Sequence, residues 1–129
     1  MMPQTLILIR GIPGSGKTTL AESLSKALNF CHYEAAQYFL SGQGEYLFNP
    51  KYLKYAHRRC YLNTKEALEA GYSVIVSNTF TRKWEMEPYR NLAASLDIQV
   101  SVLICNNEFQ NIHGVPEAKV QQMKERFEL

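Results

Sequence analysis

The stretch GIPGSGKT, Gly11 to Thr18, decides the fold of this chain of 129 residues. It matches the pattern GxxxxGK[ST] in full, between an apolar β-rich run, Gln4 to Arg10, and a segment with leucines at helical spacing. In such a strand–turn–helix, glycines let backbone N–H groups converge on phosphate oxygens at the start of the helix. A glycine-rich turn that fits by chance is the alternative, but its flanking strand and helix favour a nucleoside triphosphate site.

The motif also assigns roles to its polar side chains. Lys17 can reach the β- and γ-phosphates of the nucleotide, and the Thr18 hydroxyl can ligate Mg²⁺. The residues predicted to bind the nucleotide are Gly11, Ile12, Pro13, Gly14, Ser15, Gly16, Lys17, Thr18 and Thr19. The motif predicts triphosphate binding and leaves open which molecule receives the phosphate.

Outward from this motif, expected strands alternate with expected helices. The apolar patterns predict strands over 4–10, 32–35, 72–79 and 98–104, and helices over 18–30, 50–68, 82–96 and 116–129. This order predicts one α/β domain over residues 1–129, with a parallel sheet of four to five strands flanked by helices. Ligands should bind beyond the carboxyl ends of those strands.

Charge, hydropathy and cysteine content restrict the partners and the cellular compartment to be expected for this domain. The formal net charge of +2 is too small to indicate a nucleic-acid or membrane partner by itself. The early apolar run, Leu6 to Ile9, is far shorter than a membrane span and lacks the form of a secretory signal. Cys31, Cys60 and Cys105 form no CxxC pair, so the sequence predicts reduced thiols in a cytoplasmic protein, without a disulfide or zinc site.

Four blocks together resemble short P-loop ATP-binding proteins related to 5′-polynucleotide kinases. They are GIPGSGKTTLA, YEAxxYF, VIVSNTFTRKWEMEPY and NIHGVPEAKVQQMKERFE, and the resemblance runs from about Leu6 to Glu128. It implies ATP- and Mg²⁺-dependent phosphorylation of a hydroxyl, in the best-known members the 5′-OH of RNA or DNA. It also implies a mobile C-terminal lid, roughly residues 106–118, in which Asn111 and His113 are candidate nucleotide contacts. A purely structural role for His113 is the competing interpretation.

Three positions that the resemblance expects to be charged are neutral here. Ala36 stands where an acid should accept the proton of the acceptor hydroxyl, and Gln110 stands where the lid commonly has Arg. Ser77 stands where many relatives carry an acid at a strand end, so Mg²⁺ would depend on Thr18, phosphate oxygens and water held by Ser77 or Asn78. The alanine is either an engineered replacement of a natural aspartate or a natural loss.

Glu34 is a possible substitute for the missing base. If the strand continues through Ala36, both side chains face the same side, with Glu34 about 6–7 Å farther back. A solvated or salt-bridged glutamate is the favoured interpretation of that position. Loss of the base should slow transfer about 10²–10⁴-fold.

Several side chains could bind the acceptor. Arg82, with Lys83 beside it, follows the third strand and could hold an acceptor phosphate or developing charge, although a surface helix start would also explain it. A stripe of Lys51, Lys54 and Arg58 could track a phosphodiester backbone, but a solvated helix face is favoured. Aromatics near the acceptor loop could stack on a base or form a local core, the latter slightly favoured: Tyr38, Phe39, Tyr46 and Phe48. Trp84, Met86 and Tyr89 are predicted to pack in the core.

The leading hypothesis is therefore a P-loop kinase-like protein that uses ATP and Mg²⁺ to phosphorylate the 5′ end of single-stranded RNA or DNA. One alternative is a kinase for a nucleoside or another small metabolite. A second is a catalytically inactive protein that binds partners in a nucleotide-dependent way. The sequence leaves the oligomeric state open.

Overall fold

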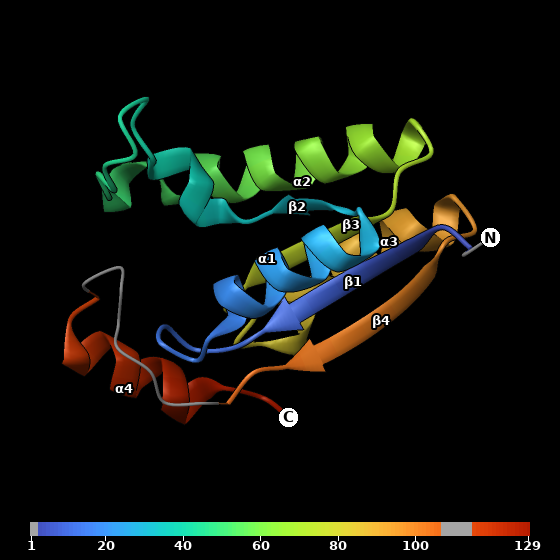
Figure 1. Cartoon of the computed structure of the whole chain (residues 1–129). Coiled ribbons are helices and arrows are strands. Elements are labelled where there is room, and N and C mark those ends of the chain that lie inside the picture. Colours follow the sequence, from blue (N-terminus) through green and yellow to red (C-terminus); the bar gives the residue numbers. More distant parts are fainter. Residues whose placement is uncertain (1–2, 107–114) are drawn as a thin grey trace.

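The computed structural model describes residues 3–106 and 115–129 of the chain. Its described part contains one parallel sheet of four strands in the order β2-β3-β1-β4 (Figure 1). The strands are β1 (Thr5–Arg10), β2 (Cys31–Tyr33), β3 (Val74–Asn78) and β4 (Gln99–Ile104). The predicted parallel α/β architecture is confirmed, with four strands in these ranges.

Helices follow the strands in the predicted order. The α-helices are α1 (Lys17–Leu28), α2 (Leu53–Glu69), α3 (Glu87–Ser95) and α4 (Glu117–Arg126). Short 3₁₀ helices also occur: η1 (Ala35–Phe39) follows β2, η2 (Pro50–Tyr52) precedes α2, and η3 (Lys83–Met86) precedes α3. Pro50 and Pro88 each lie in a first helical turn, where their missing N–H groups cost nothing.

The helices cover the sheet on both faces, which makes three layers. Alternate residues of β1 point to opposite faces, so Leu6 and Leu8 pack with α2 and α3 while Ile7 and Ile9 pack with α1. The carboxyl ends of the strands meet at one edge, where the glycine-rich turn lies and toward which the arrows of β1 and β4 point (Figure 1). This edge is the place where such sheets bind ligands.

A buried arginine fastens the C-terminal residues to the sheet. The side chain of Arg10, at the end of β1, is 2% exposed and donates hydrogen bonds to the carbonyls of Phe80 and Glu128. Its guanidinium lies 4.5 Å from the ring centre of Phe127. Phe80 has a left-handed backbone, φ 43°, and these bonds hold its carbonyl in that strained conformation. Arg10 is therefore one of the groups that attach the end of α4 to the sheet.

Two predictions about individual residues differ from the structure. Trp84 is 70% exposed rather than buried, whereas Met86 and Tyr89 are core residues as predicted. The cause is the 3₁₀ turn η3, whose periodicity of three residues buries Met86 and directs Trp84 to solvent. The second strand does not continue through Ala36 but ends at Tyr33, and Ala36 lies in η1.

In the described ranges, no helix is long and apolar enough to cross a membrane.

Candidate functional site

The glycine-rich turn forms a cradle between β1 and α1. Gly14 and Gly16 have left-handed backbones, with φ of 84° and 88°, and Gly16 caps the N-terminus of α1. These conformations turn successive N–H groups toward one point, as anion-binding loops require. A Cβ at Gly11 would lie 2.2 Å from the Ser15 Oγ and 2.8 Å from the Cys105 carbonyl oxygen, so only glycine fits there. Within the described part of the chain, the buried Ser15 hydroxyl has no hydrogen-bond partner.

Lys17 carries its charge inside this cradle. Burial lowers the pKa of the Lys17 ammonium below its ordinary value, and the negative Glu34 side chain partly opposes that shift. In the protein without nucleotide, the negative charge of Glu34 therefore offsets only part of the cost of burying the Lys17 ammonium. A bound triphosphate would supply the missing negative charge.

One carboxylate oxygen of Glu34 accepts hydrogen bonds from two hydroxyl groups beside the cradle. The Thr18 Oγ1 donates a hydrogen bond to the Glu34 Oε2 at 3.0 Å, and the Ser77 Oγ donates to the same oxygen at 2.8 Å. Since the hydroxyl hydrogen of Ser77 goes to Glu34, the contact of 2.7 Å between Ser77 Oγ and His32 Nε2 needs a hydrogen atom on that nitrogen. The chain His32–Ser77–Glu34–Thr18 therefore links β2, β3 and the cradle.

The position of Glu34 corrects the sequence-based interpretation. Its side chain is only 10% exposed, accepts a hydrogen bond from Thr18 and lies 3.7 Å from His32 Nε2, so it is not solvated. It is also not set back along a strand that continues to Ala36, because β2 ends at Tyr33. The backbone N–H of Glu34 donates to the Gln37 side chain, and that of Ala35 donates to the Asn78 side chain at 2.9 Å. These bonds turn the chain into η1 directly after Glu34. The sheet order, with β2 next to β3, is the signal that would have placed Glu34 beside Ser77.

The other predicted site residues lie at various distances from the cradle or outside the described part of the chain. Ala36 is half-buried in η1, and Ser77 is buried at the end of β3, within the chain of side chains described above. Arg82 lies on the surface, where its guanidinium is 3.9 Å from a carboxylate oxygen of Glu128. Asn111 and His113, with most of the predicted lid, lie outside the described residues. The roles assigned to all of these residues stay predictions.

The oxygen donors beside the cradle fit a magnesium ion. Thr18 and Ser77 supply hydroxyls and Glu34 supplies a carboxylate, all of them hard ligands. No cluster of three or more His, Cys, Asp or Glu side chains suited to a metal occurs in residues 3–106 and 115–129. Mg²⁺ keeps several waters and usually takes only one or two carboxylates plus substrate phosphates, so a single acid is sufficient. A divalent ion held here by Thr18 would supply positive charge that neutralises phosphate charge.

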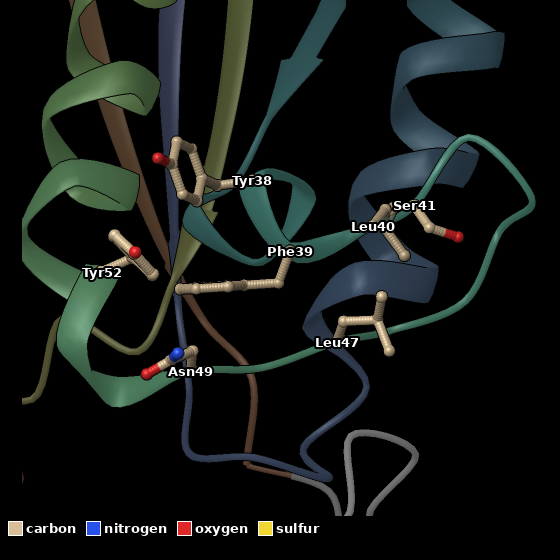
Figure 2. A pocket seen from close by; sticks show the side chains of 7 residues that line it. All are labelled: Tyr38, Phe39, Leu40, Ser41, Leu47, Asn49 and Tyr52. Carbon is tan, nitrogen blue, oxygen red and sulfur yellow. The ribbon is translucent and has the colours of Figure 1, made fainter.

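An open pocket of about 430 Å³ lies beyond η1, between it and the start of α2 (Figure 2). Figure 2 shows Phe39 across the middle of this pocket, with Tyr38 and Tyr52 around it. Tyr38 is 45% exposed and Tyr52 is 40% exposed, whereas Phe39 is buried. The predicted local core thus holds for Phe39, against which Tyr46 packs, while the exposed Tyr38 is available to a ligand. The remaining lining residues are Leu40, Ser41, Leu47 and Asn49.

Comparison with known proteins identifies the family. A family model described as an AAA domain matches residues 6–129. The chain belongs to this family. Human NEDD4-binding protein 2 is 33% identical to this AAA-domain protein over 135 residues, which cover 95% of the chain and 8% of that relative. An uncharacterized protein of Pasteurella multocida (strain Pm70) is 28% identical, over 93% of the chain and 74% of that protein.

Solved structures share the fold of this AAA-domain protein, and kinases are among them. The Pnkp1/Rnl/Hen1 RNA repair complex aligns with a TM-score of 0.66 and 17% identity, over 99% of this chain and 47% of that one. A gluconokinase from Sinorhizobium meliloti 1021 aligns at 0.63 and 16%, over 98% and 76%. The APS kinase CysC of Mycobacterium tuberculosis aligns at 0.61 and 14%, over 98% of each chain. The resemblance to P-loop kinase-like proteins is confirmed.

Proposed function

We propose that this protein is an ATP- and Mg²⁺-dependent kinase-like domain whose acceptor is the 5′-hydroxyl of a single-stranded polynucleotide. The observation that carries the acceptor proposal is the continuity of η1. This short helix holds Ala36, begins directly after Glu34 at the phosphate site, and continues into the aromatic pocket at Tyr38. An acceptor lying in that pocket would present its hydroxyl beside position 36. The RNA repair complex among the fold relatives agrees with this choice.

The chemistry follows from the groups around the cradle. The oxygen of the acceptor hydroxyl forms a bond to the γ-phosphorus, the bond from that phosphorus to the bridging oxygen of ADP breaks, and the hydroxyl proton leaves. Lys17 and the turn of N–H groups stabilise charge on the phosphate oxygens, while Thr18 holds the metal. Ala36 carries no group that can take the proton, so in this proposal the proton passes to solvent. We therefore expect slow transfer, about 10²–10⁴-fold below a form with a carboxylate.

The pocket favours bases over a small hydroxyl compound. Its exposed tyrosine rings, Tyr38 and Tyr52, offer flat faces on which bases can stack at about 1–3 kcal/mol each. The side chain of Lys51 lies 5.8 Å from the ring centre of Tyr52, so a cation borders the same aromatic surface. An aromatic surface with a neighbouring cation suits a strand with bases and phosphates.

The test compares this chain with its Ala36→Asp variant in transfer of labelled γ-phosphate from ATP to a 5′-OH oligonucleotide. We expect the variant to be at least about 10²-fold faster. Ala27→Asp is the matched control, since Ala27 is exposed near the end of α1 that lies away from the cradle. Equal, low transfer by all three proteins that bind ATP would contradict the oligonucleotide assignment. Transfer to nucleosides alone would favour a small-molecule kinase, and ATP binding without any transfer would favour a nucleotide-dependent binding protein.

A further inference from the structure

We infer that Glu34, at the end of β2, is the acid that positions Mg²⁺ in this site, in the place that an acid on β3 would otherwise hold. Ser77, near the end of β3, has a neutral hydroxyl and so supplies no negative charge to a metal ion. Glu34 comes from the neighbouring strand and reaches both Ser77 and the Thr18 hydroxyl of the cradle. The inference rests on the proposed nucleotide site and is independent of the acceptor.

The hydrogen bond from Thr18 to Glu34 prepares the hydroxyl for a metal. A hydroxyl that ligates Mg²⁺ through its oxygen must direct its hydrogen atom elsewhere. The Glu34 Oε2 accepts that hydrogen at 3.0 Å, which fixes the rotamer of Thr18 and leaves oxygen lone pairs for the ion. An outer carboxylate that orients a metal ligand in this way typically changes metal affinity 10–100-fold.

Glu34 also keeps capacity to bind a water of the ion. A carboxylate offers about four lone-pair sites. The bonds from Thr18 and Ser77 both end at Oε2, so they use only part of that capacity. Mg²⁺ dehydrates reluctantly and retains several waters. A water-mediated contact with Glu34 therefore matches the preference of the ion.

The surroundings keep this carboxylate in place. The Ser77 hydroxyl that bonds to Glu34 also contacts His32 at 2.7 Å, and the Glu34 backbone is held by the Gln37 side chain at 3.2 Å. The side chains of His32 and Glu34 are both 10% exposed. A preorganised, largely desolvated acid attracts a cation more strongly than a solvated one. We therefore regard Glu34 as a positioning residue for the metal.

The experiment measures ATP binding by calorimetry at increasing Mg²⁺, and in EDTA, for the unchanged chain and for Glu34→Gln. The amide keeps the size of the side chain and an oxygen acceptor but loses the charge. We expect the Mg²⁺ concentration that gives half of the affinity gain to rise at least about tenfold. ATP affinity in EDTA should stay the same or increase, because a negative charge near the phosphates has been removed. Glu45→Gln, at an exposed loop position, is the matched control and should leave both quantities unchanged.

Two further variants make the result decisive. Glu34→Gln combined with Ser77→Asp moves the acid to β3, and a recovered Mg²⁺ response would support a metal role at this point of the site. Glu34→Asp replaces the amide variant if that protein does not fold, and its shorter carboxylate should also weaken the Mg²⁺ response.

An unchanged Mg²⁺ response in Glu34→Gln would overturn the inference. An equal loss of ATP affinity with and without Mg²⁺ would also overturn it and assign Glu34 a purely structural role. Failure of the unchanged chain to bind ATP under any condition would instead contradict the proposed nucleotide site.

Discussion

At the residue scale, the directions of two hydroxyl hydrogens determine how the side chains of the proposed phosphate site are arranged. Thr18 and Ser77 both direct theirs to one oxygen of Glu34, and Ser77 then accepts from His32. Burial lowers the pKa of His32 below its ordinary value, while the nearby Glu34 raises it, with the effect of burial larger. A neutral His32 is consistent with donation through Nε2 alone. Glu34 is thus the one negatively charged member of this group of side chains, and its carboxylate lies next to Thr18.

A second residue-scale consequence concerns Gly11, where an added methyl group has no room. The change Gly11→Ala would place a Cβ 2.2 Å from the Ser15 Oγ and 2.8 Å from a backbone oxygen of Cys105, so the cradle must shift. We expect a loss of about 1–3 kcal/mol in the free energy of unfolding, together with weaker ATP binding. Urea denaturation and calorimetry measure the two effects.

Gly42→Ala is the matched control for this change. A Cβ at Gly42 would meet no atom within 4 Å, and we expect stability within about 0.5 kcal/mol of the parent or slightly above it. If Gly11→Ala resembles Gly42→Ala in both measurements, the close packing of the cradle does not limit position 11.

At the element scale, the sequence predicted what depends on local pattern. The motif at Gly11 to Thr18, the apolar run of β1 and the proline-led start of the segment at Pro50 each have short-range signals, and the structure has an element at each. The end of β2 has no such signal. It depends on a side chain of β3, Asn78, which accepts from the N–H of Ala35 and turns the chain away from the sheet. The role of Glu34 was therefore hidden, because a contact across 43 residues creates it.

The attachment of α4 is an element-scale feature that can be tested. None of the residues of α4 is buried, whereas Phe127 directly after it packs on the guanidinium of Arg10 at 4.5 Å. The Glu128 N–H also donates to the Thr81 carbonyl at 2.7 Å. Within α4, Arg126 donates to the Thr81 hydroxyl at 3.1 Å, so the last residue of the helix and the residues after it together fix its position. Figure 1 shows this end of the chain running back toward the carboxyl edge of the strands.

We expect Phe127→Ala to destabilise the protein by about 1–2 kcal/mol, because the buried charge of Arg10 loses its aromatic partner. Proteolysis should then cut α4 before the rest of the chain. Leu129→Ala is the control, since Leu129 is 85% exposed and its loss should change stability by less than about 0.5 kcal/mol. Equal stability and equal protease resistance of the two variants would show that the contact between Phe127 and Arg10 does not anchor this helix.

At the scale of the whole molecule, the proposed nucleotide site draws on three of the four described strands of the sheet. The cradle follows β1, Glu34 follows β2 and Ser77 belongs to β3, three adjacent strands that the core holds in register. A ligand that needs all three should bind the folded state alone, and its binding energy should oppose global unfolding. Such a ligand stabilises by about 2.7 kcal/mol at a concentration 100 times its Kd.

Lys17→Met separates this effect of binding from the stability of the free protein. The charge of Lys17 is partly desolvated, which lowers its pKa and makes the empty site costly to fold. We therefore expect the free variant to be as stable as the parent or more stable, with a higher midpoint in urea. Saturating ATP·Mg²⁺ should raise the midpoint of the parent and leave that of the variant unchanged. A variant that is less stable when free, or that gains as much from ATP·Mg²⁺ as the parent, would show that Lys17 serves the core instead of the phosphates.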